Sequence, residues 1–339
     1  MTTFQTCCNR LLAAAALASL GSNAAAHTVH TGPHSQPLST LNIPQVEQSV
    51  DALLKQYSLS GNDELLIAAR WQLPPAEAPR SVPELLQAAW LAQAEHDFNR
   101  ARLLLKQVLA RKPNSGQAWL LEAAIADVVG DSAAARHACG NVLLSVSPEA
   151  AVVCFGAIAD STPQKRIALE RIKNLPPPSS DSHLRAWRWS VHGELARDLG
   201  FPDTAEVLFL RAIAIFPAVQ TRATLMDLYF QQERYHEALA LSNENEAVPA
   251  LAVRRLLAQR GMGEDISAAI TQFDKLFQTW LAAADYRHAR EMAMFYIDLK
   301  PRVSLAFRVA QINATLQKEP EDLALLHRAS ILQQETRDN

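Results

Sequence analysis

One stretch of the chain, from Trp189 to Pro217, constrains the fold most because it contains a complete helix-turn-helix pattern. Trp189 and Gly193 lie four residues apart and share one face of a first predicted helix, whereas Ala205 and Phe209 share one face of a second. Gly193 and Ala205 are small where the two helices of a hairpin would cross closely, and Pro217 ends the second helix. The stretch therefore predicts an antiparallel helical hairpin.

The same pattern recurs on both sides of this hairpin. Ala101 and Ala135 are 34 residues apart, and Ala205 and Ala238 are 33 residues apart. A helical unit that repeats at this spacing predicts stacked hairpins, because each unit buries its apolar face against the next. The predicted helices span 83–95, 98–111, 116–128, 132–145, 150–160, 163–175, 221–232, 235–242, 249–260, 265–283, 286–299, 303–317 and 321–335. The last five of these helices cannot all pair as hairpins, because five is an odd number.

The order W-x3-G…A-x3-F…P resembles the tetratricopeptide repeat, whose pattern is W-x2-L-G-x2-Y…A-x3-F…P. His192 stands where that family prefers Leu, and Ala196 where it prefers Tyr. The resemblance implies an all-α, tetratricopeptide-type helical-hairpin solenoid, wound as a right-handed superhelix. It also implies that the first helices of the hairpins line a concave groove that holds a protein or a peptide.

The N-terminus has the features of a secretory signal peptide. Arg10 precedes an apolar run from Leu11 to Leu20, and small residues follow up to Ala26. We therefore expect a periplasmic or secreted protein with no transmembrane segment in the mature chain, because the apolar run is too short to span a bilayer. The expected organisation is a signal peptide (1–26), a disordered tail (27–43), a capping hairpin (44–81) whose first helix starts at Pro44, a first repeat block (82–175), a Pro/Ser linker (176–183) and a second repeat block with a C-terminal capping helix (184–339).

The expected tail carries His27, His30 and His34 and no Asp, Glu, Lys or Arg before Asn42. Cleavage after Ala26 would leave an N-terminal histidine whose amine and imidazole chelate Cu(II), and cleavage two residues earlier would leave a square-planar copper or nickel site. A metal-handling protein is therefore the alternative functional hypothesis. The same residues also fit a solvated linker that binds no metal.

Two cysteines, Cys139 and Cys154, remain after the expected cleavage. Cys139 lies on the second helix of one predicted hairpin and Cys154 on the first helix of the next, and such helices pack together in a solenoid. An oxidising compartment would favour a disulfide between them. Two buried reduced thiols fit the same positions, because cysteine is common in protein cores.

The sequence contains none of the phosphate-binding, nucleophile or paired-cysteine motifs that mark the commonest enzyme families. The 32 basic and 35 acidic residues give a net charge of −3 without a basic run, which does not predict nucleic-acid binding. These observations favour a non-catalytic scaffold with a protein or peptide partner and no cofactor in its folded part.

The expected partner site lies on the first helices. Trp187 is two residues from Trp189, which places it about 200° around the helix and away from the hairpin seam. We expect two groups of side chains to face the groove, while contact between neighbouring repeats is the alternative. The groups are Leu86, Trp90 and Gln93 on the first unit and Trp187, Glu194 and Arg197 on the later one.

Overall fold

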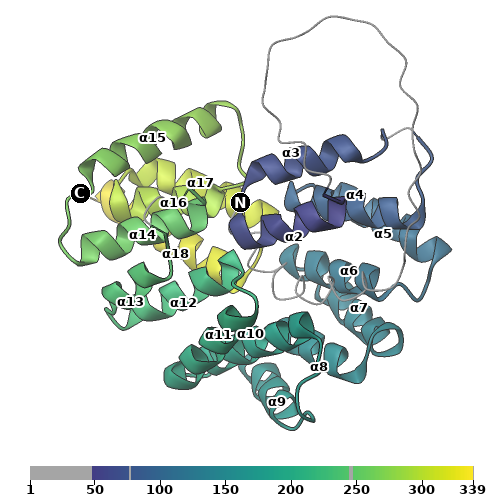
Figure 1. Ribbon diagram of the computed structural model, residues 1–339. Helices are drawn as coiled ribbons and strands as arrows, with labels where there is room; N and C mark the ends of the chain where they lie inside the picture. Colours follow the sequence, from purple (N-terminus) through teal and green to yellow (C-terminus); the bar gives the residue numbers. More distant parts are fainter. Residues whose placement is uncertain (1–47, 76–77, 244–246, 339) are drawn as a thin grey trace, which may run out of the picture.

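The computed structural model describes residues 48–75, 78–243 and 247–338, and within these ranges it contains helices and no strand (Figure 1). The helices follow one another around an arc, and the C-terminal helices turn back inside it (Figure 1). This is the all-α hairpin solenoid that the repeat pattern predicts. Its helices are α2 (Val50–Ser60), α3 (Asp63–Gln72), α4 (Val82–Ala94), α5 (Phe98–Arg111), α6 (Gly116–Val128), α7 (Ser132–Ser145), α8 (Pro148–Ala157), α9 (Thr162–Lys173), α10 (Ser182–Asp198), α11 (Pro202–Ile215), α12 (Val219–Gln231), α13 (Tyr235–Ala240), α14 (Pro249–Gly261), α15 (Ser267–Ala282), α16 (Ala289–Met294), η2 (Phe295–Leu299), α17 (Val303–Leu316) and α18 (Pro320–Asp338).

The hairpin of α10 and α11 has the local chemistry that its sequence predicts. The Asp181 carboxylate accepts hydrogen bonds from two backbone amides of the first turn of α10, which caps that helix. Gly200 adopts a φ of 82° in the turn, a conformation that glycine reaches without steric cost. A Cβ at Gly193 would lie 2.9 Å from the Phe209 ring, so the two helices cross as closely as the small residue allows. The predicted hairpin is therefore confirmed.

His192 makes this hairpin sensitive to pH. Its ring stacks on Trp189, and burial together with the charges of Lys173 and Arg188 lowers its pKa from 6.5 to about 4. The unfolded chain therefore takes up a proton at a higher pH than the folded chain does. We expect stability to fall as the pH drops from about 6.5 to about 4, because the folded state excludes this proton until the lower value.

Substitution of His192 by Leu, the residue that the tetratricopeptide repeat prefers here, should flatten that dependence. The measurement is the free energy of unfolding by urea at several pH values between 4 and 7. The exposed His236 provides the matched control, His236→Leu. Equal pH profiles for the parent and His192→Leu would contradict this interpretation. Partial burial of His96 likewise holds its pKa well below the usual value, so part of the parent's dependence should persist.

The hydrophobic core of the N-terminal half, called the first core below, continues across the Pro/Ser linker expected at 176–183. One cluster of buried side chains runs from Leu85 in α4 to Leu195 in α10, and it includes Ile172 before the linker. Arg188 donates from its guanidinium to the carbonyls of Pro176, Leu175 and Ile172, and so fixes the Pro-rich segment against α10. The interpretation of 176–183 as a break between two blocks is therefore not supported by the packing.

The last helices differ from the predicted pattern in one place. The expected helix 286–299 is shorter and consists of α16 followed by the π-helical turn η2, in which Lys300 N–H donates to Phe295 O. Phe295 and Tyr296 both contact the Phe277 ring of α15, at centroid distances of 5.2 and 6.4 Å. The wider turn thus lets two consecutive rings pack on one partner. Helix α16 packs on α17 and α17 packs on α18, whereas α14 packs on α12 and α13.

The N-terminal hairpin of the solenoid touches its C-terminal half. Leu59 at the end of α2 accepts a hydrogen bond from Arg222 of α12 at 3.5 Å. A Cβ at Gly61 would lie 2.6 Å from a methyl group of Val248, so the turn after α2 packs directly against the start of α14. Asp63 forms an ion pair with Arg287 at 3.4 Å. The capping hairpin therefore closes the arc against its own C-terminal half. The expected helix start at Pro44 lies outside the described residues, and the helix found here begins later, at Val50, where Ser49 caps it.

A disulfide joins two successive hairpins. The sulfur atoms of Cys139 in α7 and Cys154 in α8 are 2.02 Å apart, and both residues are fully buried. The bond lies within the first core, beside Val142 and Val153. It covalently ties the second hairpin of the first core to the third.

Removal of this disulfide should destabilise the protein by about 3 kcal/mol, since the bond closes a loop of 15 residues. The variant is Cys139→Ala with Cys154→Ala, and the measurement is chemical denaturation followed by circular dichroism. Reductant supplies the control, because it should lower the stability of the parent by a similar amount and leave the double variant unchanged. An insensitive parent would show that the two thiols are reduced in the folded protein.

Candidate functional site

The structure buries most of the side chains that the sequence places in a partner groove. Trp187 is 0% exposed, Gln93 is 1% exposed and Glu194 is 4% exposed. Leu86 and Trp90 are half-buried and pack against the first core. The prediction of a free surface is therefore wrong for Trp187, Gln93 and Glu194, and the structure does not bring Trp90 and Trp187 together at one surface.

Trp187 is buried because a first helix in this solenoid has more than one packed face. Helix α10 contacts α11 in its own hairpin and also α8 and α9 of the preceding one. Trp187 points away from Trp189, as predicted, but it enters the first core beside Leu184 and Val191. Trp90 is half-buried, because it packs between that core and the smaller core of α2, α3 and α4. These residues therefore make contacts between neighbouring repeats, which is the alternative that the sequence left open.

Arg197 does lie on the inner side of the arc, where it meets a segment of its own chain. We call residues 317–322, which comprise the connection after α17 and the first turn of α18, the inner segment. Lys318 N–H donates to the Val128 carbonyl at the end of α6 at 2.8 Å, and the Gln317 amide nitrogen lies 3.3 Å from His96 Nδ1 in the turn after α4. A Cβ at Gly130 would lie 3.0 Å from the Lys318 side chain. The inner segment therefore spans the ends of successive first helices.

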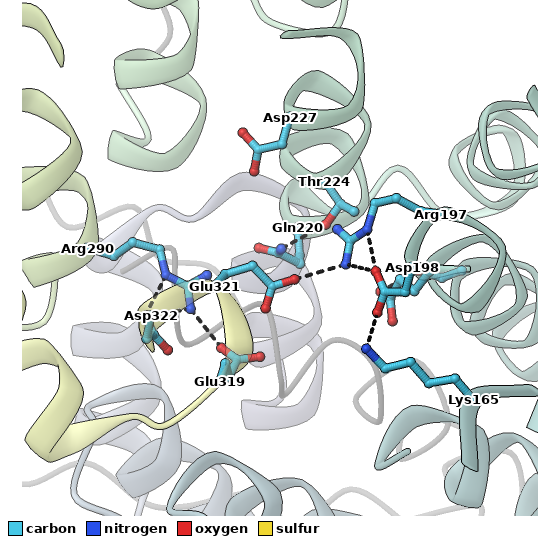
Figure 2. Close-up of polar contacts among 12 residues, drawn as sticks. Lys165, Arg197, Asp198, Gln220, Thr224, Asp227, Arg290, Glu319, Glu321 and Asp322 are labelled. Atoms are coloured by element: carbon cyan, nitrogen blue, oxygen red, sulfur yellow. Dashed lines mark hydrogen bonds and ion pairs between the residues drawn. The ribbon is translucent and has the colours of Figure 1, made fainter. Parts of the chain in front are cut away.

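Three carboxylates of the inner segment face two arginines of the first helices (Figure 2). Arg290 of α16 contacts Glu319 at 3.0 Å and Asp322 at 2.6 Å, and all three side chains are at most 5% exposed. Burial acts to lower the Arg290 pKa, but the neighbouring carboxylates of Asp322 and Glu319 raise it above its ordinary value. Arg290 therefore remains charged in an environment where an unpaired ion would be very unfavourable. Asn313 of α17 also donates to Asp322.

The third carboxylate, Glu321, reaches across to α10. It lies 2.9 Å from Arg197, which also contacts Asp198 at 2.7 Å. Lys165 of α9 contacts the same Asp198 carboxylate at 2.7 Å. Figure 2 shows this row of alternating charges running from Lys165 through Asp198 and Arg197 to Glu321. It links the C-terminal end of the solenoid to its middle hairpins.

The neighbouring first helices present further paired polar groups. Arg254 of α14 forms a bidentate pair with Asp227 of α12, with two contacts of 2.7 Å. Gln220 donates to Thr224 one turn along α12 at 3.0 Å. Burial would lower the Arg254 pKa, but the charges of Asp227 and Glu291 raise it. These polar groups of α12 and α14 are therefore paired among themselves, whereas Arg197 and Arg290 are the arginines that pair with the inner segment.

The outer side of the solenoid is different in character. Second helices expose large apolar side chains, and one groove of about 870 Å³ lies between α5 and α7 with α6 at its base. Leu103 and Lys106 of α5 form one wall, and His137 of α7 forms the other. Trp119 at the base contacts the His137 ring edge to face at 5.4 Å. The groove thus combines an aromatic base with exposed apolar and basic walls.

Other expected site residues lie outside the part of the chain that is described. This applies to the copper or nickel ligands His27, His30 and His34. Within the described ranges, no group of three His, Cys, Asp or Glu side chains is arranged to hold a metal ion. No helix there is both long and apolar enough to cross a membrane.

Sequence reasoning missed the partners of the inner face. Glu319, Glu321 and Asp322 stand together at the start of the last helix, where acidic residues are ordinary because they favour a helix N-terminus. Arg290 lies near the start of the helix predicted at 286–299 and belongs to no recognised sequence motif. The sequence does show an acidic turn and several arginines on otherwise apolar helices. It does not show which arginine meets which carboxylate.

Comparison with known proteins does not identify a family for this chain. No model of a known protein family matches this sequence, and no curated protein matches it either. Among solved structures, the crystal structure of the APC/C hetero-tetramer Cut9-Hcn1 contains a similar chain, with 18% identity and a TM-score of 0.45. The match covers 85% of this chain and 57% of that chain. The similarity is too low to transfer a partner or an activity.

Proposed function

We propose that this chain is an exported protein-binding scaffold, closed on its inner side by its own inner segment and open to a partner on its outer side. A scaffold of this kind presents a rigid surface to its partner and catalyses no reaction. The disulfide between Cys139 and Cys154 supports export, because such bonds persist in oxidising compartments and are rare in the cytosol.

The observation that carries the proposal is the distribution of exposed apolar side chains. Leu103 of α5 is 64% exposed, Leu144 of α7 is 85% exposed and Ile167 of α9 is 54% exposed. Val207 and Leu210 of α11 are also exposed. Single exposed apolar residues are ordinary on a protein surface, but their recurrence on successive second helices beside a groove is typical of an interaction surface.

Site-specific photo-crosslinking in the native organism tests this role. A benzophenone amino acid replaces Leu103, Leu144 or Leu210 on the outer helices, and Leu323 of α18, which is 49% exposed, serves as the control position. We expect the outer positions to form covalent adducts with another protein and the control position to form none. Adducts at Leu323 alone, or no adduct at any position, would contradict a scaffold that binds through its outer helices.

A further inference from the structure

We propose that the C-terminal helices α15 to α18 form a lid over the inner face, hinged at α14 and latched by the inner segment. In the closed form these helices turn back inside the arc (Figure 1). In the open form they swing away as one body and make the ends of α4, α6 and α10 accessible. Opening is a property of the chain alone and does not depend on a scaffold function.

The hinge side is held by apolar packing. Helix α14 contributes Leu251 to the core of the middle hairpins, and it contributes Val253 and Leu256 to the core of the C-terminal helices. Separation of the lid from α14 would therefore expose apolar surface that both cores bury. A rotation at the helix contacts of α14 retains both cores, as in other hinge and shear movements of packed helices.

The latch side is held by polar groups. Among the described residues, the core of the C-terminal helices shares no buried side chain with the first core or with the core of the N-terminal hairpin. Lys318 N–H donates to the Val128 carbonyl, and the Gln317 amide lies beside the His96 ring. A polar interface of this kind permits relative motion, whereas a large apolar interface does not.

Two ion pairs complete the latch. Glu321 reaches from the inner segment to Arg197 of α10, as Figure 2 shows, with side chains that are 31% and 14% exposed. Arg287, between α15 and α16, contacts Asp63 of the N-terminal hairpin, with side chains that are 34% and 38% exposed. Ion pairs that water reaches contribute little to stability. The closed form is therefore held less firmly at the latch than at the hinge.

The buried charges do not oppose opening. Arg290, Glu319 and Asp322 all belong to the lid, so their mutual contacts move with it. Water solvates Glu321 and Arg197 once the two side chains separate, so neither is left as an unpaired buried ion. Opening of the lid therefore requires much less free energy than unfolding of the lid.

Salt should shift the equilibrium towards the open form, because dissolved ions screen the two exposed ion pairs. The Debye length falls from about 10 Å at 0.1 M to about 3 Å at 1 M ionic strength. The apolar contacts at the hinge carry no charge, so the same ions do not screen them. The lid is therefore expected to open as one folded body.

Hydrogen exchange of the purified full chain, followed by mass spectrometry, tests the latch. The peptide that contains Lys318 is informative, because the Lys318 amide is bonded to Val128 only in the closed form. Its exchange should be about tenfold faster at about 1 M than at about 0.1 M NaCl. Glu321→Gln should exchange rapidly at both concentrations. Arg328→Ala, which removes an ion pair within the lid, should behave like the parent.

Small-angle X-ray scattering at the same two salt concentrations measures the shape. The radius of gyration of the parent should increase with salt. An oxidised disulfide between Gly130→Cys and Lys318→Cys should abolish that increase by locking the latch, because a Cβ at Gly130 would lie 3.0 Å from the Lys318 side chain.

Three results would overturn the proposal. The first is an exchange rate at Lys318 that neither salt nor Glu321→Gln changes. The second is an equal acceleration of exchange at Lys318 and at Phe295, in the core of the C-terminal helices, which would mean that the lid unfolds. The third is faster exchange at Lys318 with a constant radius of gyration, which would mean that the inner segment frays while the lid stays in place.

Discussion

Arg290→Ala should lower the free energy of unfolding by about 3–5 kcal/mol, because it leaves two buried carboxylates without their counter-ion. Arg290 is the shared partner of Glu319 and Asp322, and the three side chains are at most 5% exposed. Water cannot replace the lost charge at this depth. The measurement is urea denaturation of the full chain, followed by circular dichroism at constant pH.

Two matched variants separate this effect from a general weakening of the C-terminal helices. Arg328→Ala removes an ion pair with Asp298 whose arginine is 53% exposed, and we expect it to cost less than about 1 kcal/mol. Arg290→Met combined with Glu319→Gln and Asp322→Asn removes all three charges and should recover much of the lost stability, because no unpaired ion remains. A single Arg290→Ala variant as stable as Arg328→Ala would show that the inner segment does not depend on this cluster.

Trp187→Ala should cost about 3–5 kcal/mol, as expected for truncation of a fully buried aromatic side chain. Trp187 is 0% exposed and lies in the first core, where its removal leaves a large cavity beside Leu184 and Val191. The result expected for a groove-lining tryptophan is the opposite, namely an unchanged melting temperature with weaker partner binding. Thermal unfolding therefore distinguishes core packing from the interface role that the sequence indicated.

Trp71 provides the comparison for this variant. It lies at the end of α3 and is 82% exposed, so Trp71→Ala should change stability by no more than about 0.5 kcal/mol. Both substitutions remove the same side chain, and only burial differs. Equal melting temperatures for the two variants would mean that Trp187 is not packed as described.

Local pattern was enough to predict the hairpins of this chain. Small residues such as Gly193 and Ala205, the turn glycine Gly200 and the helix-starting Pro202 act within a single unit, so their spacing reports the geometry directly. The expected helices from 83 onward agree with the structure to within a few residues, apart from the π-helical turn after Met294. That exception depends on a contact with Phe277 from another helix, which no local pattern contains.

The inner face could not be predicted in this way, because it depends on how far the solenoid curves. Arg197 and Glu321 are 124 residues apart, and Gln317 and His96 are 221 residues apart. Small rotations between successive hairpins add up over the whole array and decide whether these residues meet. The outer groove was missed for a related reason, since Leu103 and Lys106 gain meaning only when α7 lies alongside α5.

The account depends on the inner segment lying against the first helices, and an engineered cross-link tests this most directly. A Cβ at position 130 would lie 3.6 Å from the Lys318 Cβ, within the range of about 3.5–4.5 Å that disulfides require. The test variant is therefore Gly130→Cys with Lys318→Cys, in a chain whose Cys7 and Cys8 are replaced by serine. Its control carries Gly130→Cys with His327→Cys, whose second thiol lies about two turns along α18.

Mass spectrometry of the oxidised, alkylated and digested protein gives the decisive reading. The account predicts that the 130–318 bridge forms nearly completely in the native protein, that it does not form in concentrated guanidinium chloride, and that the control pair stays unbridged. Two alkylated thiols at positions 130 and 318 in a natively folded protein would show that the inner segment does not occupy the inner face.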